Sequence, residues 1–292
     1  MPTTVHLGPE PDPEVEEAIS AAGGEIGPLA DADALVWLGS NPEELPELPD
    51  RVRWVQLPSA GVEQWVEAID GRVWTSAAGA FARPVAEHAL MLMLAGVHQL
   101  GPFLRATTWT RPPLGELDGA TVAIVGAGAI GRALIEMLAP LRTEVLAVTR
   151  RGRDGTIPVS RLEEVWPRAD FVVLAAPATA GTRHLVGADE LEAMREDAWL
   201  INVARGSLVD TDALVAALAA GSIGGAALDV TDPEPLPDGH PLWDEPRALI
   251  TPHVANPDSS WSRYLGEHVG ENVRRFIAGE DLLAVIDRDA GY

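Results

Sequence analysis

Three glycines near the middle of the chain follow an apolar run at a fixed spacing. Residues 121–131 read TVAIVGAGAIG, with the glycines at Gly126, Gly128 and Gly131. Between a strand and a helix, the first glycine permits a tight turn, the second lets the backbone approach a pyrophosphate, and the third lets the helix pack on the sheet. A glycine-rich turn that binds no ligand could have the same sequence pattern. The apolar run before it and the helical pattern at 132–138 favour a dinucleotide site.

Two arginines, Arg150 and Arg151, stand about twenty residues further on, where the next apolar run at 144–149 ends. An Asp or Glu at this place usually binds the ribose 2′-hydroxyl of NAD and would repel a 2′-phosphate. Two guanidinium groups can instead pair with that phosphate bidentately. We therefore expect NADP as the cofactor, with NAD left open. The alternative is an exposed basic loop end.

Three polar residues, Arg205, Glu234 and His253, each follow an apolar run late in the chain. Reduction of a carbonyl needs a proton at oxygen while hydride arrives at carbon, and histidine ordinarily titrates near neutral pH. A carboxylate such as Glu234 would favour the imidazolium and orient it. The guanidinium of Arg205 could hold a 2-oxo acid's carboxylate and polarise its carbonyl. Taken singly, these residues could be a surface cation, a turn glutamate and a loop histidine.

Short apolar runs alternate with helical patterns along the chain, which predicts an α/β fold with parallel sheets. The expected strands are 4–7, 34–38, 52–57, 72–76, 121–125, 144–149, 170–176, 198–203, 225–230 and 248–251. Their apolar runs are continuous, which indicates helices on both faces of each sheet.

The alternation predicts two doubly wound, Rossmann-like domains with a cleft between them, where ligands should meet. The last thirty or so residues begin as a helix and are expected to return to the first domain. We therefore expect a discontinuous, flavodoxin-like substrate domain of residues 1–88 and 263–292. The NAD(P)-binding domain should comprise residues 89–262.

Composition narrows the class of protein. The 292-residue chain has no cysteine, which excludes disulfides and thiolate metal sites, and we expect no metal. Its formal net charge of −23 should repel nucleic acid. The apolar run 89–97 is too short for a bilayer span and is interpreted as a buried core helix, so no membrane association is expected. No secretory signal is seen, and a cytoplasmic location is expected.

The segments around the three polar residues resemble those of the D-isomer-specific 2-hydroxyacid dehydrogenases. They read NVARGSLVD at 202–210, ALDVTDPEPLP at 227–237 and TPHVA at 251–255. In that family the arginine binds and polarises the substrate, the glutamate supports the histidine, and the histidine is the acid and base. The resemblance implies these catalytic roles for Arg205, Glu234 and His253.

The resemblance covers nearly the whole chain and implies further site residues. The cofactor residues that it implies are Gly126, Gly128, Ala129, Ile130, Gly131, Pro177, Thr182, Val203 and Asp229, besides Arg150 and Arg151. The counterpart of Asp229 holds the nicotinamide carboxamide. The segment PSAGVE at 58–63 resembles the loop whose amides receive the substrate carboxylate, with Gly61 and Val62 as donors. A helix N-terminus capped by Ser59 is an alternative that can hold at the same time.

Within the family, three segments look most like the bacterial glyoxylate and hydroxypyruvate reductase A group. These are 34–37, 149–151 and the closing 286–292. This likeness implies NADPH-dependent reduction of small 2-oxo acids to D-2-hydroxy acids, and it places Trp37 at the substrate, with core packing as the alternative. A homodimer is expected. Trp109 and the apolar helix at 83–100 could lie in its interface or pack within the chain.

Two other functions are compatible with parts of this sequence. Corepressor-like proteins that only sense NAD(P) share this fold, and formate dehydrogenases of the family have Gln in place of Glu beside the histidine. The complete set of Arg205, Glu234 and His253 favours the reductase. The remaining histidines have no evident partner pattern and are expected to be structural: His6, His88, His98, His184, His240 and His268.

Overall fold

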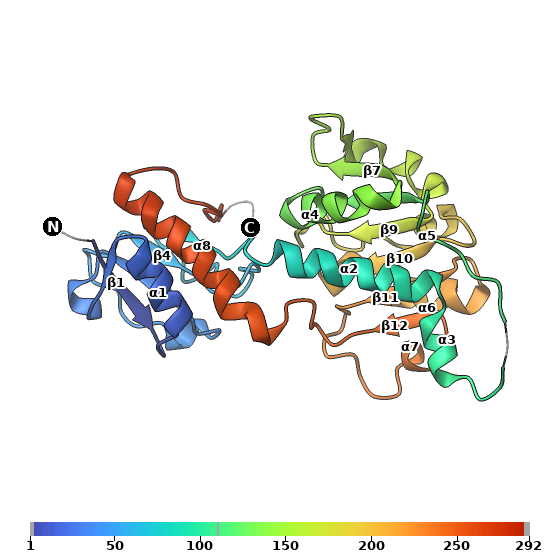
Figure 1. Ribbon diagram of the computed structural model, residues 1–292, viewed down its shortest axis with the longest axis horizontal. Coiled ribbons are helices and arrows are strands. Elements are labelled where there is room, and N and C mark those ends of the chain that lie inside the picture. Colours follow the sequence, from blue (N-terminus) through green and yellow to red (C-terminus); the bar gives the residue numbers. More distant parts are fainter. Residues whose placement is uncertain (1–2, 110, 289–292) are drawn as a thin grey trace. The chain divides into compact units, whose positions relative to one another are not determined.

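The computed structural model describes residues 3–109 and 111–288, which form two compact α/β units (Figure 1). Unit 1 comprises Met1–Phe81 and Asn256–Tyr292, and unit 2 comprises Ala82–Ala255. The boundaries expected after residues 88 and 262 fall inside two uninterrupted helices, α2 (Ala82–Val97) and α8 (Asp258–Ala278). Part of the closing segment, residues 289–292, lies outside the described residues.

Unit 1 contains a five-stranded parallel sheet in the order β2-β1-β3-β4-β5. This is the flavodoxin-like order, so the predicted fold class is confirmed for this unit. The strands are β1 (Thr3–Gly8), β2 (Gly24–Ile26), β3 (Ala34–Trp37), β4 (Trp54–Gln56) and β5 (Val73–Thr75). The unit also contains α1 (Pro13–Ala21) and two short 3₁₀ helices at Leu29–Asp31 and Pro42–Glu44.

Helix α8 returns the chain to unit 1 and packs along α1. The close approach passes over Gly266 and Gly270, where an added Cβ would lie 3.1 Å from backbone oxygens of α1. The amide of buried Asn272 donates to Gln56 Oε1 at 2.9 Å, and its Oδ1 accepts from the N–H of Leu283 at 2.7 Å. These bonds attach both α8 and the segment after it to the sheet.

Unit 2 contains a seven-stranded parallel sheet in the order β12-β11-β10-β9-β6-β7-β8. The strands are β6 (Thr121–Val125), β7 (Glu144–Thr149), β8 (Ile157–Pro158), β9 (Phe171–Leu174), β10 (Trp199–Asn202), β11 (Gly225–Leu228) and β12 (Ala248–Ile250). The chain leaves β6 toward β7 and then returns to place β9 on its other side. Ligands of doubly wound sheets bind at such a switch point, outside the carboxyl ends of the strands.

Helices cover both faces of this sheet. Helices α2 and α4 (Ala129–Leu138) pack on one face, and α5 (Ala188–Ala193) and α6 (Thr211–Ala220) pack on the other (Figure 1). The double cover explains why the strands are continuously apolar. The remaining helices of the unit are α3 (Leu100–Arg105), α7 (Pro241–Asp244) and the 3₁₀ helices Ala139–Leu141, Val159–Glu164, Trp166–Arg168 and Gly206–Leu208.

Helix α2 carries the apolar run that was interpreted as a core helix. Ala89, Leu92 and Met93 on it are buried, which confirms that interpretation for one face, whereas Met91 and Leu94 are exposed. Among the helices of residues 3–109 and 111–288, none is both long and apolar enough to cross a membrane.

Candidate active site

The glycine-rich turn of unit 2 has the geometry that a pyrophosphate requires. Gly126 has a φ of +103°, and a Cβ there would lie 2.5 Å from the backbone carbon of Ala175. A Cβ on Gly131 would lie 2.7 Å from the carbonyl oxygen of Gly126. Beside Gly128, which precedes α4, the Cβ position has no atom within 4 Å. Gly126 and Gly131 therefore leave no room for a side chain, because the backbone packs closely at both positions. The space beside Gly128, next to the helix N-terminus, is open. These residues fit the pyrophosphate of a dinucleotide.

The other predicted cofactor residues lie at the carboxyl edge of the same sheet. Ala129 and Ile130 begin α4, and buried Val203 follows β10. In the loop after β9, the hydroxyl of Thr182 donates to the carbonyl of Pro177 at 2.8 Å. This bond fixes the shape of the loop. The loop lies next to the glycine turn because β9 pairs with β6.

Arg150 and Arg151 follow β7, the strand that pairs with β6 on the other side, and both side chains are exposed. The turn that carries them is closed by Thr149, whose Oγ1 accepts from the N–H of Gly152 at 3.1 Å. The arginines therefore follow the second strand of this unit, which is the position where dinucleotide-binding units carry the residue for the ribose.

His253 and Glu234 form a direct pair. The Nδ1 atom of His253 lies 2.7 Å from Glu234 Oε1, and the side chains are 51% and 41% exposed. His253 has a φ of +54°, and its N–H donates to the carbonyl of Asp229 at 2.8 Å. Histidine is among the residues that tolerate this left-handed conformation, which is uncommon for side chains with a Cβ and is frequent at functional sites. The turn presents the imidazole to solvent.

Arg205 lies in the loop after β10, close to the loop that carries Glu234. The amide of Asn202 donates to the Arg205 carbonyl at 2.8 Å and fixes this loop. A Cβ on Gly206 would lie 1.9 Å from the carbonyl oxygen of Thr231, so the two loops are in backbone contact. Since β10, β11 and β12 are neighbours, the structure brings the loops of all three predicted catalytic residues to one edge of the sheet.

Asp229 is buried and holds the turn that contains His253. Its Oδ1 accepts from Thr251 Oγ1 at 2.6 Å and from the N–H of Val254 at 3.0 Å, and its Oδ2 accepts from the N–H of Ala255 at 3.1 Å. Burial raises the pKa of the Asp229 carboxyl, but hydrogen bonds from His88, Thr251 and the two amides outweigh it and bring the pKa below its usual value. The carboxylate is therefore ionised at neutral pH.

The sequence shows no partner pattern for His88, and the structure supplies its partners. Its Nε2 atom lies 2.9 Å from Thr251 Oγ1 and 3.3 Å from Asp229 Oδ1. Residue 88 is 163 positions away from Thr251 in the chain. No local periodicity connects residues so far apart, so this contact could not be read from spacing.

In unit 1, the loop after β4 contains the predicted substrate donors Gly61 and Val62. The alternative of a helix N-terminus capped by Ser59 is wrong, because residues 63–68 form turns and the Ser59 hydroxyl donates to the carbonyl of Gly61 at 2.7 Å. Trp37 ends β3 and is packed in the core, and its Nε1–H has no hydrogen-bond partner within the part of the chain that the structure describes. Core packing therefore explains the position of the indole ring, but it leaves the Nε1–H donor without a hydrogen-bond acceptor among the described residues.

Within residues 3–109 and 111–288, no group of three or more His, Asp or Glu side chains is arranged to hold a metal ion.

Comparison with known proteins gives the family. Residues 88–255 match the model of the NAD-binding domain of D-isomer specific 2-hydroxyacid dehydrogenases. The chain belongs to this family. It is therefore an NAD(P)-dependent 2-hydroxyacid dehydrogenase, which can also be described as a 2-oxoacid reductase.

Individual relatives match along almost the full length. A protein of Corynebacterium melassecola, described as an uncharacterized protein in the proB 3′ region, is 41% identical over 96% of this chain and 97% of its own length. A family member from Xanthobacter autotrophicus Py2, solved with NADPH and MES, is 26% identical with a TM-score of 0.83 and covers both chains fully (100% each). The NADPH-dependent glyoxylate/hydroxypyruvate reductase of Sinorhizobium meliloti, solved with NADP and sulfate, is 28% identical with a TM-score of 0.83, covering 99% and 100%.

Proposed function

We propose that this dehydrogenase uses NADPH to reduce small 2-oxo acids of the glyoxylate and hydroxypyruvate type to D-2-hydroxy acids. The observation that carries the proposal is the 2.7 Å pair of His253 and Glu234, which stands at the same sheet edge as the Gly126 turn. The likeness to the Sinorhizobium meliloti reductase supports the substrate class and the cofactor.

The proposed proton donor is Nε2 of His253. An ionised carboxylate only accepts hydrogen bonds, so Glu234 requires the hydrogen on Nδ1 of the ring and orients the imidazole. Nε2 then faces away from Glu234 and delivers the proton to the carbonyl oxygen. NADPH, when bound, supplies the hydride to the carbonyl carbon. In the reverse direction the neutral Nε2 accepts the proton of the substrate hydroxyl.

The substrate's carboxylate is proposed to bind to Arg205, whose guanidinium can also polarise the adjacent carbonyl. By the family resemblance, the backbone amides of Gly61 and Val62 are further donors to this carboxylate. The unpartnered Nε1–H of Trp37 supports a substrate role for that side chain, because buried donors are rarely left unsatisfied. The residues proposed to hold the cofactor are Gly126, Gly128, Ala129, Ile130, Gly131, Arg150, Arg151, Pro177, Thr182, Val203 and Asp229.

The direct test of function is NADPH oxidation with glyoxylate, hydroxypyruvate, pyruvate and phenylpyruvate as substrates. We expect turnover on the first two. The His253→Ala variant should lose about 10²- to 10⁴-fold in kcat, the range for a general acid, and should still bind NADPH. Absence of turnover on all four acids would contradict the proposal and favour an NAD(P)-sensing role. Parental turnover by His253→Ala would show that the proton comes from another group.

Cofactor preference is tested with the double variant Arg150→Ala/Arg151→Ala. Loss of one charge-assisted hydrogen bond costs roughly 1.5–3 kcal/mol, so the Kd for NADPH should rise at least about 10-fold. NADH lacks the 2′-phosphate, and its Kd should change little. Arg161→Ala/Arg168→Ala is the matched control, because it removes the same charge from exposed ion pairs of the same unit. Equal weakening of NADPH and NADH would refute the assignment.

We further propose that the protein acts as a homodimer through one face of unit 2. A run of exposed apolar side chains follows α2, α3 and the segment after them: Met91, Leu94, Leu100, Phe103, Leu104, Trp109 and Leu114. Leu104 is 78% and Trp109 is 92% exposed. Large apolar side chains that stay in water over a continuous segment are typical of an interface.

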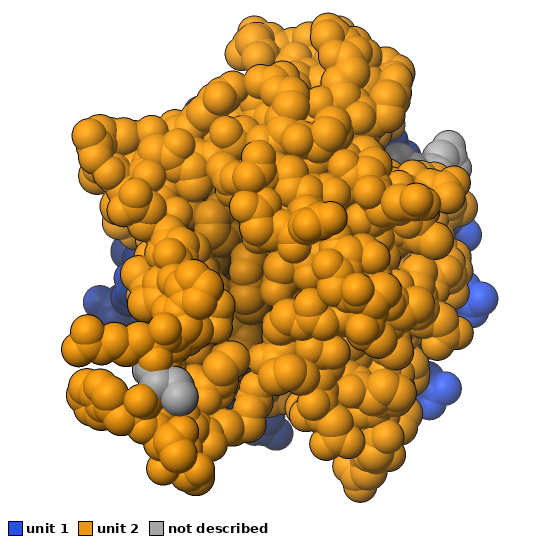
Figure 2. All heavy atoms as spheres, turned by 90° about the vertical axis from the view of Figure 1, so that its right-hand side faces the viewer, with its two compact units in different colours: residues 1–81, 256–292 blue, residues 82–255 orange. Residues whose placement is uncertain are grey.

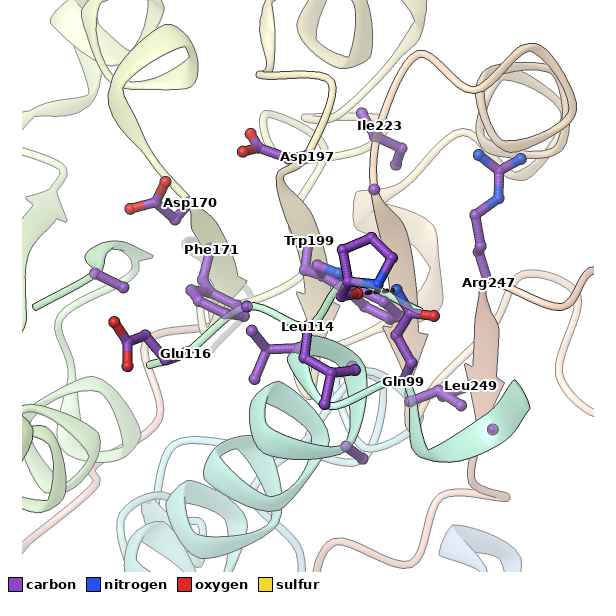
Figure 3. Close-up of a pocket in the computed structure, with 18 of the residues that line it drawn as sticks. Gln99, Leu114, Glu116, Asp170, Phe171, Asp197, Trp199, Ile223, Arg247 and Leu249 are labelled. Atoms are coloured by element: carbon purple, nitrogen blue, oxygen red, sulfur yellow. Dashed lines mark hydrogen bonds between the residues drawn. The ribbon is translucent and has the colours of Figure 1, made fainter. Parts of the chain in front are cut away.

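The same face is hollowed at the amino-terminal edge of the seven-stranded sheet (Figure 2). The hollow has a volume of about 720 Å³, and Phe171, Trp199 and Leu249 from three strands line it together with Leu114 (Figure 3). It lies opposite the carboxyl edge that carries the catalytic loops, so a second copy seated there would leave those loops accessible.

Sedimentation velocity tests the dimer. Leu104→Glu and Trp109→Glu should shift the protein to monomers at micromolar concentration, because each places a charge in an apolar contact. Val159→Glu is the control, since Val159 is also exposed but lies outside this segment. A monomeric parent, or variants that remain dimeric, would contradict the proposed interface.

A further inference from the structure

We propose that His88 is a positioning residue for the reaction, which holds Thr251 and Asp229 so that the turn at His253 keeps the catalytic imidazole in place. The inference rests on the proposed acid-base role of His253. It assigns a task to a histidine that comes from α2 and is remote in sequence from the catalytic loops.

The hydrogen bonds around Thr251 determine which atom of His88 carries a hydrogen. The Thr251 hydroxyl has one hydrogen, and an acceptor-only carboxylate, Asp229, lies 2.6 Å away. That hydrogen is therefore donated to Asp229. Thr251 Oγ1 can then only accept from the ring nitrogen 2.9 Å away, so Nε2 of His88 is the donor. The same nitrogen stands 3.3 Å from Asp229 Oδ1 and reinforces the carboxylate's position.

Asp229 transmits this restraint to both sides of His253. Its carboxylate accepts the N–H groups of Val254 and Ala255, which follow the histidine, and its backbone carbonyl accepts the N–H of His253 itself. The carboxylate is thus a clamp on a turn whose φ of +54° is unfavourable for a residue with a Cβ. The turn at His253 therefore keeps its conformation only while the Asp229 carboxylate stays in position.

The helix that carries His88 is a rigid support. Ala89, Leu92 and Met93, on the following turns of α2, are buried against the sheet. The His88 side chain is only 14% exposed and the Asp229 side chain 1%. In such a dry environment a hydrogen bond to a charged group is worth more than at the surface. By comparison, the pair of His184 with Asp210 spans 3.6 Å and is about 40% exposed on both sides.

Two substitutions at this position separate positioning from packing. His88→Leu fills the space and removes the donor, whereas His88→Gln keeps an N–H donor at the end of a side chain of similar reach. His98→Leu is the matched control, because it changes a histidine just after the same helix. For each variant we would measure kcat and KM with NADPH and a 2-oxo acid. Amide hydrogen exchange of Val254 and Ala255 would be measured on the protein alone.

We expect His88→Leu to lower kcat about 10- to 100-fold, as for a displacement of the order of 1 Å at the reacting group. Its KM for NADPH should also rise, because Asp229, which His88 holds in place, is among the residues proposed to hold the cofactor. Exchange of the Val254 and Ala255 amides should quicken about 10-fold, since a weakened clamp exposes them more often. His88→Gln should recover most of both losses, and His98→Leu should match the parent.

Two results would overturn the proposal. One is that His88→Leu keeps the kcat and the amide exchange rates of the parent, which would mean that Asp229 holds its position without the hydrogen bond from His88. The other is an equal loss in His88→Leu and His88→Gln, which would mean that ring shape and not the donor matters. Exchange is measured without substrate, so a parent that fails to reduce any 2-oxo acid would refute the proposed function while exchange still decides whether His88 holds the turn.

Discussion

Replacing Gly206 by alanine should force apart the loops that carry Arg205 and Glu234. An added Cβ would lie 1.9 Å from the carbonyl oxygen of Thr231, whereas ordinary van der Waals contact begins near 3.4 Å. The loops must therefore separate by about 1.5 Å, the difference between these two distances. The neighbours are backbone atoms, so no flexible side chain can move aside to relieve the contact.

The size of the effect follows from this displacement. Misplacing a catalytic group by about 1 Å can cost 10²-fold, so we expect kcat/KM of Gly206→Ala to fall by roughly that factor or more. Overpacking costs about 1–3 kcal/mol, which should lower the Tm by several degrees. The Kd for NADPH should rise less than kcat/KM falls, because the Gly126 turn is made by β6 and α4, and only Val203 and Asp229 of the proposed cofactor residues lie in the two displaced loops.

Steady-state reduction of glyoxylate and titration with NADPH would be compared in the parent, Gly206→Ala and Gly71→Ala. Gly71 is the matched control, because a Cβ there would meet no atom within 4 Å and its φ is not positive. If Gly206→Ala kept parental kcat/KM and Tm, the contact between the two loops would not position the catalytic residues, and this reasoning would be refuted.

Three other outcomes are expected. Asn272→Leu should destabilise unit 1 by about 3 kcal/mol and speed thermolysin cleavage after α8, since buried bonds to Gln56 and Leu283 are lost; unchanged cleavage would contradict this. The pKa of Asp229 is lower in the folded protein than in the unfolded chain. The ionised carboxylate therefore stabilises the folded state at pH values above the unfolded pKa of about 3.9, and this stabilisation is lost as the pH falls through the lower pKa of the folded state. The Tm difference between parent and Asp229→Asn should therefore be constant from about pH 7 to 5 and then shrink, whereas a difference independent of pH would contradict it. With a net charge of −23, the Tm should rise when KCl is raised from about 0.05 to 1 M, and a flat response would show that repulsion is unimportant.

Local patterns in the sequence predicted the parts of the molecule that depend on neighbouring residues. The Gly126 turn, the strand that ends before Arg150 and the later parallel strands were anticipated because continuous apolar runs are typical of strands covered on both faces. The strand β2 (Gly24–Ile26) was not anticipated. It has three residues, of which only Gly24 is buried, so it has neither the length nor the apolar content of the others.

Features that depend on distant contacts were not predictable. The role of His88 requires knowing that α2 lies beside the end of β12, which no spacing reveals. The Ser59 alternative failed for a related reason, because a serine before a turn can accept or donate, and here it donates to Gly61. The family resemblance pointed to Arg205, Glu234 and His253, whose loops follow the neighbouring strands β10, β11 and β12, but only the structure shows the Gly206 contact that brings two of these loops together.

We propose that this dehydrogenase transfers hydride from NADPH to only one face of the carbonyl carbon of a 2-oxo acid. The measurement is to supply NADPH deuterated twice at C4 of the nicotinamide with hydroxypyruvate, and to analyse the glycerate by mass spectrometry and chiral chromatography. We expect D-glycerate with one deuterium, at C2. L-glycerate, product without deuterium at C2, or no product at all would contradict it.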